Sequence, residues 1–447
     1  LTLKEEPGKR IQPESHAVIA PTATTNIFLD RQYHEQDLIN LIHSGKEWFG
    51  EEITKTNPSV SVDFEFPNRI TERPVMVNME FAGRSITESL QFNFSVNGQT
   101  LFENITLLQL GVSNSTYARE NQQQLSFQDE NENLTFKLEM QAQGENSKGW
   151  LNYIRVNAWR ELKYTDKALQ FRYPEVIGAD EAVVYQIANA TTNLQLWDVT
   201  DPLVPKQMNY SISNNQLVFQ ANAEILKEYI LFKPEHMLSI SGFKAIANQN
   251  LHGIAACDML IIAHPDFLEQ AEALAQIHFE DDGLVSEVVN IDAIYNEFGS
   301  GSKDVTAIRD FARMLYFKSE QQLKYLLLFG DASFDYKEKI APNSNFVSTY
   351  QATNSTVETL SFVSDDYFGL FDSNEGLNME GIVDIGIGRL PVRNHEEANT
   401  MIKKIKHYLQ KDGSSLGEWR NNITFMADDA DDNLHFRQAE TLANTVD

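Results

Sequence analysis

A series of short apolar runs in the C-terminal part of the chain constrains its fold more than any other feature. Each run is rich in aliphatic side chains and ends at a charged or polar residue, and the runs are residues 258–264, 325–331, 383–389 and 422–429. Several intervals between them have apolar positions at helical spacing, namely residues 265–279, 302–317 and 396–409. Strands that alternate with helices pair in parallel through right-handed crossovers. The pattern therefore predicts an α/β domain with a mainly parallel sheet.

The polar residues that end these runs should share one edge of that sheet. In α/β folds, ligands bind outside the carboxyl ends of parallel strands. We therefore expect His264, Asp331, Arg389 and the Asp428–Asp429 pair to line up there. Structural roles compete with functional ones, since His264 could belong to a pocket or cap the following helix, and Asp331 could accept hydrogen bonds from turn amides.

The first half of the chain has the pattern of β structure. Between residues 61 and 165, apolar and polar side chains alternate at the period of a half-buried strand, and turn signals such as Asn97-Gly98 separate the runs. This predicts an antiparallel β-sandwich domain, followed by a second β-rich domain at residues 166–245. Residues 1–60 are a mixed segment in which we expect a short helix at 35–44.

Composition narrows the classes of partner. A chain of 447 residues with 42% hydrophobic residues should form two to four globular domains. Its formal net charge of −28 argues against a nucleic-acid partner, because phosphate binding needs a concentrated positive surface. No apolar run approaches the roughly 20 residues of a membrane-spanning helix. The sequence starts at Leu1, from which we expect a processed or trimmed N-terminus.

Cys257 is the single cysteine, so no disulfide can form within the chain. His252 lies near it in sequence, as a thiol and imidazole pair would require. However, Cys257 stands at the beginning of its predicted strand and therefore faces the edge opposite His264 and Asp331. We expect it to be a small buried apolar residue.

Two acidic stretches could carry chemistry. Asp365, Asp366 and Asp372 lie in a long loop and could hold a structural Ca²⁺ through carboxylate oxygens. The alternative is a solvated acidic loop, and the spacing matches no EF-hand. The stretch 428–435 could orient an imidazole, as the third member of a triad does, or cap the next helix. We expect no required cofactor.

Three motifs carry a resemblance to a known family. They are Tyr325-Leu-Leu-Leu-Phe-Gly-Asp331, Ser364-Asp-Asp-Tyr-Phe-Gly369 and Asp384-Ile-Gly-Ile-Gly-Arg-Leu-Pro-Val392. With them, the chain from about residue 255 onward resembles the gingipain family of cysteine peptidases. The upstream part, at residues 44–50, 150–157 and 197–202, resembles the cell-surface sortases of the type IX secretion system in Bacteroidota.

The resemblance implies a caspase-like unit made of two α/β halves. Residues 255–412 would be the first, non-catalytic half, and residues 413–447 would begin the truncated catalytic half. Such sortases remove the C-terminal signal domain of secreted cargo and transfer the cargo to an anionic lipopolysaccharide through a cysteine thioester. They act on the extracellular face of the outer membrane, docked on the outer-membrane β-barrel PorV with other attachment-complex proteins.

The chain departs from the family pattern at the catalytic motifs. It has no Gly-His-Gly turn and no Ala-Cys pair that follows a strand, so this fragment should be inactive. By the resemblance, Asp428 or Asp429 would support a histidine outside the chain, and His435, His264 and Arg389 would line the substrate pocket. His435 lies near the position of a gingipain aspartate that recognises arginine, which argues against arginine specificity. The rival interpretation is a non-enzymatic cell-surface interaction protein with a degenerate gingipain-like fold.

Overall fold

The computed structural model shows two compact units, each with its own hydrophobic core. One consists of Leu1–Ala247 with Gln351–Val363, and the other of Asn248–Tyr350 with Ser364–Asp447. The structure describes residues 10–15, 19–111, 115–142, 144–239, 242, 245–318, 320 and 322–446. The first unit is built of β-sheets and the second has a parallel sheet with helices, which confirms the predicted fold class.

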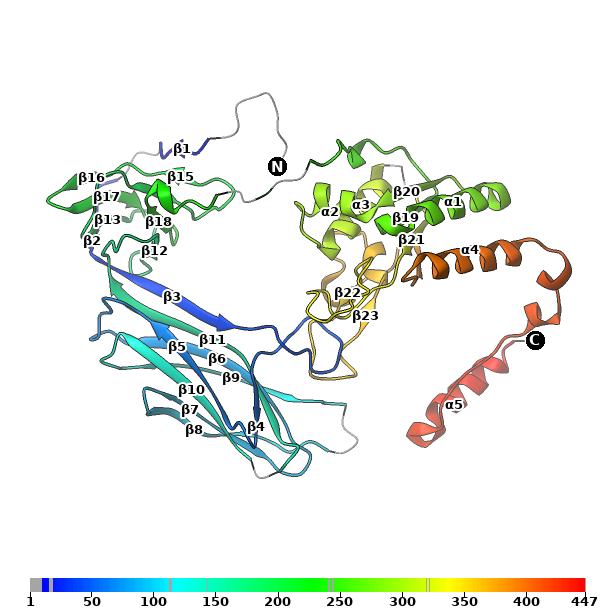
Figure 1. The fold of residues 1–447 in the computed structure, drawn as a ribbon, viewed down its shortest axis with the longest axis horizontal. Helices are drawn as coiled ribbons and strands as arrows, with labels where there is room; N and C mark the ends of the chain where they lie inside the picture. The colour runs from blue at the N-terminus through cyan, green and yellow to red at the C-terminus, as the bar shows by residue number, and fades with distance from the viewer. Residues whose placement is uncertain are drawn as a thin grey trace. The chain divides into compact units, whose positions relative to one another are not determined.

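Two sheets of the first unit form a β-sandwich (Figure 1). One sheet has the order β5-β10-β7-β8, with strands β5 (Ser59–Glu65), β10 (Asn133–Gln141), β7 (Leu90–Val96) and β8 (Gln99–Leu107). The other has the order β3-β11-β6-β9, with β4 also paired to β11, and its strands are β3 (Ile27–Glu35), β11 (Lys148–Glu161), β6 (Val75–Arg84), β9 (Arg119–Phe127) and β4 (Glu52–Thr54). All these strands pair antiparallel.

The sandwich core follows from the period-two pattern. Alternate residues of each strand face the other sheet, and the largest fully buried side chains in this core are Phe66, Phe81, Phe92, Phe94 and Phe136. Asn97 and Gly98, both with positive φ, join β7 to β8, as two-residue hairpin turns require. The turn and the alternation were both readable from the sequence.

A second pair of sheets belongs to the same unit. Their orders are β1-β15-β14-β18-β12 and β16-β17-β13-β2. The strands are β1 (Gln12–Pro13), β2 (Ala23–Thr25), β12 (Leu169–Arg172), β13 (Ala182–Ile187), β14 (Gln195–Asp198), β15 (Lys206–Gln207), β16 (Ser211–Ser213), β17 (Gln216–Asn222) and β18 (Glu228–Phe232). Aromatic rings fill the core between them, with Tyr185 stacked on Phe219 at 4.7 Å between centroids.

The strands of the first 60 residues are shared between these modules. β3 and β4 enter the sandwich, whereas β1 and β2 pair in parallel with β15 and β13. The helix expected at residues 35–44 is wrong, since no helix forms there. The Asn40 side chain accepts from the Ser44 amide and donates to the Gly45 carbonyl, at 3.0 Å each. Such side-chain bonds to the local backbone compete with helix formation.

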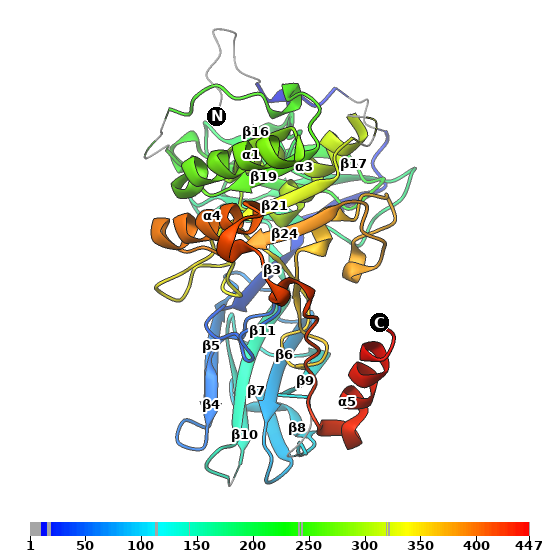
Figure 2. The same cartoon turned by 90° about the vertical axis from the view of Figure 1, so that its right-hand side faces the viewer.

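The second unit is organised around a parallel sheet of order β20-β19-β21-β24. Figure 2 shows β19, β21 and β24 of this sheet side by side. Its strands are β19 (Met259–Ala263), β20 (Ser286–Asn290), β21 (Tyr325–Phe329) and β24 (Gly386–Leu390). Its helices are α1 (Leu268–Asp282), α2 (Ile291–Phe298), α3 (Val305–Lys318), α4 (His395–Leu409) and α5 (Ala430–Ala443). Two short strands, β22 (Tyr350–Gln351) and β23 (Val363–Ser364), pair with each other.

Helices cover both faces of this sheet, as its continuous apolar strands predicted. Leu260 and Ile262 of β19 join the core with α2 and α3, whereas Met259, Ile261 and Ala263 join the core with α1 and α4. The two helix pairs lie on opposite sides of the strands (Figure 1). No described helix is long and apolar enough to cross a membrane.

Shorter 3₁₀ segments complete the chain. They are η1 (Pro234–His236), η2 (Leu251–Gly253), η3 (Pro265–Phe267), η4 (Asp366–Gly369), η5 (Leu377–Met379), η6 (Gly413–Ser415) and η7 (Glu418–Asn421). The strand expected at residues 422–429 is wrong, because no strand forms there. A strand needs a neighbour for its backbone hydrogen bonds, and no described strand pairs with this segment. Its apolar side chains Ile423, Phe425 and Met426 are exposed.

Candidate functional site

Three parallel strands end together at one edge of the α/β sheet. Ala263 of β19 lies opposite Phe329 of β21, which lies opposite Leu390 of β24. His264 and Asp331 therefore leave the sheet at this edge, and Arg389 lies one residue before it. This part of the predicted alignment is observed. We call the group His264, Asp331, Arg389 and Asp365 the rim cluster.

Arg389 is the centre of the rim cluster, and every one of its donors is occupied. It forms a two-point ion pair with Asp365, from Nε to Oδ2 and from Nη2 to Oδ1, at 2.7 Å each. Its Nη1 donates to the carbonyls of Gly330 and Val347 at 2.8 and 2.7 Å, and Nη2 donates to the Ser348 carbonyl at 3.3 Å. A guanidinium has five N–H donors. All donors of Arg389 are therefore used within this unit, where it holds three loop carbonyls and Asp365 together, and its expected pocket role stays a prediction.

Gly330 and Asp331 shape the exit from β21. Gly330 has a φ of +148°, and a Cβ there would lie 3.0 Å from atoms of both Phe346 and Val347. The Ala332 amide donates to Oδ1 of Asp331 at 2.9 Å, and the Asp331 carbonyl accepts from Phe346 at 3.0 Å. Both residues thus hold the loop that follows the strand, which is the structural role that the turn chemistry predicted.

His264 begins the 3₁₀ turn η3. Its Nδ1 accepts from the Asp266 amide at 3.3 Å, and its ring meets the ring of Phe346 at 4.9 Å between centroids. Burial lowers the pKa of His264, although the charges of Asp266 and Asp292 act in the opposite direction. The neutral imidazole therefore caps a turn, which is one of the two roles that the sequence left open.

The structure does not bring together the three carboxylates that were expected to hold calcium, Asp365, Asp366 and Asp372. Asp365 is bound to Arg389, and the three carboxylates do not come within metal-ligand distance of one another in the described part of the chain. The backbone of this loop is held instead by Arg309, whose side chain donates to the carbonyls of Leu370, Asp372 and Glu375.

Asp428, Asp429 and His435 do not join the rim cluster. All three are exposed, and residues 422–429 do not form the strand that would have carried the two carboxylates to the sheet edge. Asp429 precedes α5 without capping it through its side chain. His435 pairs with Asp431, one turn away on α5, at 3.4 Å.

Cys257 is a buried free cysteine, and His252 is bound to other residues. The Cys257 side chain is buried, and burial raises the pKa of its thiol to about 11, with Glu287 and Asp258 adding to the effect. A nucleophilic cysteine needs a lowered pKa and access to substrate. His252 instead binds Glu297 through Nδ1 at 2.9 Å and stacks on Phe298. Neither residue forms a hydrolase pair.

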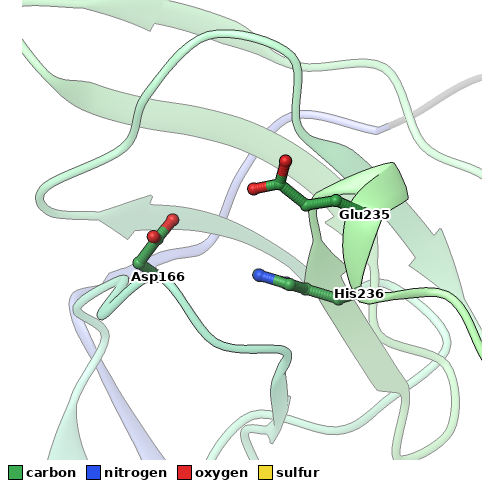
Figure 3. A group of neighbouring side chains, drawn as sticks. All are labelled: Asp166, Glu235 and His236. Carbon is green, nitrogen blue, oxygen red and sulfur yellow. The ribbon is translucent and has the colours of Figure 1, made fainter.

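One group in the β unit has the composition of a metal site. Asp166, Glu235 and His236 place their ligand atoms within 4.8 Å of one another (Figure 3). Asp166 lies about 70 residues before the adjacent Glu235 and His236, so sequence spacing gave no signal. The Lys233 ammonium contacts Asp166 and lies 3.6 Å from Glu235, and this contact lowers the pKa of Asp166. Lysine already supplies the positive charge in this group.

Comparisons with known proteins agree with this fold. Residues 254–447 match the model of Peptidase family C25. The crystal structure of dimeric latent PorU from Porphyromonas gingivalis matches with a TM-score of 0.79 and 23% identity, over 93% of this chain and 41% of that chain. This chain thus spans about two fifths of the length of that protein. No curated relative matches in sequence.

Carbohydrate-binding modules also match part of the chain. A CBM36-1 domain of a multidomain xylanase from the hindgut metagenome of Trinervitermes trinervoides has 13% identity, a TM-score of 0.19, and coverage of 28% of this chain and 96% of that one. CBM35 from Paenibacillus barcinonensis has 13% identity, a TM-score of 0.18, and coverage of 30% and 92%. Scores this low carry no functional argument.

From the family match and the PorU match, the C-terminal part resembles C25 peptidases, and the chain has a fold like that of PorU over 93% of its length.

Proposed function

We propose that this chain is the N-terminal portion of a PorU-like sortase, a cysteine transpeptidase of the type IX secretion system. One observation carries the proposal: the match to PorU extends over 93% of the chain, whereas the peptidase family model matches only residues 254–447. A peptidase domain alone would not account for the β modules that precede it. The same fold over both units favours a PorU-like protein over a peptidase of another architecture.

In this proposal the described residues act as scaffold, because they lack an active thiol. The nucleophile would be a cysteine outside these residues. Its thiolate would attack the carbonyl carbon of the scissile peptide, and the signal domain would leave with the nitrogen and a proton. An amine of an anionic lipopolysaccharide would then attack the thioester, forming an amide and regenerating the thiol. Asp428 or Asp429 would accept a hydrogen bond from the imidazole that takes the thiol proton, and His435 would line the pocket.

The proposed setting is the extracellular face of the outer membrane. The partners would be the barrel PorV, other attachment-complex proteins and the C-terminal signal domains of cargo. The net charge of −28 is compatible with protein partners and disfavours direct binding to anionic headgroups. The lipopolysaccharide would therefore have to be presented at the catalytic half and not on these units.

The test uses cells that lack the endogenous protein and carry the full reading frame. The downstream cysteine is changed to alanine in one strain, and Cys257→Ala is the matched control. We expect mass spectrometry of secreted cargo to find the C-terminal signal domain retained only in the downstream variant. Normal processing in both strains would contradict the enzyme and favour the non-enzymatic surface platform.

A second set of variants tests the two acidic candidates. Asp428→Asn and Asp429→Asn are compared with the control Asp432→Asn. Asp432 is also exposed and lies only a few residues further along the same segment. Substitution of the residue that supports the imidazole should lower the rate of cargo processing by about 10²- to 10⁴-fold. Equal rates in all three variants would remove both residues from the mechanism.

A further inference from the structure

Residues 351–361 leave the α/β part of the chain and pack within the β unit. We call this segment the strap. The Lys46 amide donates to the Ala352 carbonyl at 2.8 Å, and the Glu358 amide donates to the Ser115 carbonyl at 2.8 Å. The Thr356 carbonyl accepts from the amide of Tyr117 at 2.7 Å. The strap is therefore held at its start, middle and end by main-chain bonds.

Two hydroxyl residues at the centre of the strap are its buried anchors. Ser355 and Thr356 are 0% and 2% exposed. Oγ of Ser355 accepts from the amide of Glu47 at 2.9 Å, and Oγ1 of Thr356 donates to a carboxylate oxygen of Glu120. Both anchors thus contact segments that carry glutamates.

Three glutamates lie close to these anchors and to one another, and we call them the carboxyl cluster. Glu47 lies in the loop after β3, Glu80 on β6 and Glu120 on β9. The side-chain amide of Asn152 on β11 donates to Glu47 at 2.8 Å and to Glu80 at 3.0 Å. The donor that Glu47 and Glu80 share is thus an uncharged amide, and the carboxylates of the cluster lie close enough to repel one another.

Among the described residues, the main influences on the pKa of Glu47 are burial, two carboxylates and the Asn152 amide, and none of these is a cation. Burial, followed by the charges of Glu120 and Glu80, raises the pKa of Glu47 to about 8. Tyr153 of β11 faces Glu80, and burial and that carboxylate raise its pKa, although the charge of Arg155 over its ring acts in the opposite direction. The strap contributes neutral hydroxyls, and its Glu358 is exposed. The docked arrangement therefore retains a proton that a solvated glutamate would lose.

We propose that the carboxyl cluster and the strap form a pH-sensitive latch, in which a proton held by Glu47 keeps residues 351–361 docked on the β unit. When the cluster is fully ionised, repulsion between its carboxylates loosens the segments that hold Ser355 and Thr356. The released state exposes the strap and the loop at residues 44–47. This device goes beyond the proposed sortase function and does not depend on it.

The direction follows from proton linkage. A glutamate whose pKa is 4.5 when free and about 8 when docked binds its proton more tightly in the docked state. Docking is therefore favoured at low pH, weakens by up to about tenfold per pH unit between these two values, and changes no further above the upper one. The latch is closed in mildly acidic solution and opens toward pH 8.

Hydrogen–deuterium exchange of the whole chain between pH 6 and 9 tests the latch. The readout is the protection factor, the ratio of intrinsic to observed exchange rate, in peptides that cover residues 44–48, 115–119 and 352–360. We expect protection in all three to fall about tenfold or more from pH 6 to pH 8 and then to level. Glu47→Gln should keep these peptides protected at every pH.

Two further variants separate the latch from general loosening. Glu358→Gln removes a strap charge outside the cluster and should leave the pH profile unchanged. Glu120→Gln keeps an acceptor for Thr356 but removes one repelling charge, so the fall in protection should occur at lower pH. A flat profile in the unmodified chain, or an unchanged profile in Glu47→Gln, would overturn the proposal.

Discussion

The rim cluster of the α/β unit and the carboxyl cluster of the β unit compensate a buried carboxylate in different ways. Both bury a carboxylate from a loop against the ends or faces of strands. Asp365 is compensated by the fixed positive charge of Arg389, whereas Glu47 is compensated by a proton. A guanidinium keeps its charge across the accessible pH range, and a proton is lost as pH rises. The comparison predicts that the first cluster gives stability and the second gives responsiveness.

The largest expected effect comes from breaking the rim cluster. Arg389→Ala would leave Asp365, whose side chain is 21% exposed, without its partner and three carbonyls without their donor. Removing one member of a buried ion pair costs about 3–5 kcal/mol, so the free energy of unfolding should fall by this amount in urea titrations. Arg393→Ala, at an exposed pair with Glu397, is the control and should cause no measurable change. Equal effects of both variants would contradict the assigned role.

A smaller effect should follow from changing the turn beside Arg389. Gly330→Ala would place a Cβ against Phe346 and Val347 in a left-handed conformation, and strain of this kind costs about 1–3 kcal/mol. Gly388→Ala is the matched control, because its Cβ would meet only Leu327 at an ordinary 3.7 Å. Thermal unfolding of both variants measures the difference. If the control were the less stable of the two, the account of this turn would be wrong.

The smallest effect is the one that depends on pH. Glu47→Gln should match the unmodified chain near pH 5, where the carboxyl group is protonated when folded. At pH 9 the variant should be more stable by about 1 kcal/mol, a figure reduced for the partial exposure of the side chain. Urea unfolding at both values, followed by tryptophan fluorescence, measures this. A variant that is less stable than the unmodified chain at pH 9 would contradict the conclusion that a proton compensates Glu47.

Local patterns predicted the elements that depend on local periodicity. The alternation in β6 and β7, the Asn97-Gly98 turn and the helical stripes of α1, α3 and α4 were all readable, because each is set by residues a few positions apart. The helix expected at residues 35–44 failed where the Asn40 side chain bonds the nearby backbone. The strand expected at 422–429 failed because a strand also requires a neighbour, which no local pattern supplies.

Site roles could be predicted only in part. The strand order placed His264 and Asp331 at one edge and Cys257 away from it, since parallel strands share a direction. For the expected pocket role of Arg389 and calcium role of Asp365, the structure adds what the sequence could not show: the two side chains bind each other across 24 residues. A charged residue at a favourable edge is available for substrate only if no other part of the chain has already paired with it.

By itself, the sequence determined the two structural classes in this protein, the direction of the parallel strands and the resemblance to C25 peptidases, because periodicity and motif are properties of neighbouring residues. Only the tertiary structure decided which charges are compensated and by what. Ser355 reaches Glu47 across 308 residues, and Thr356 reaches Glu120 across 236. The physical reason is that desolvation and charge pairing depend on distances in space, which sequence separation does not encode.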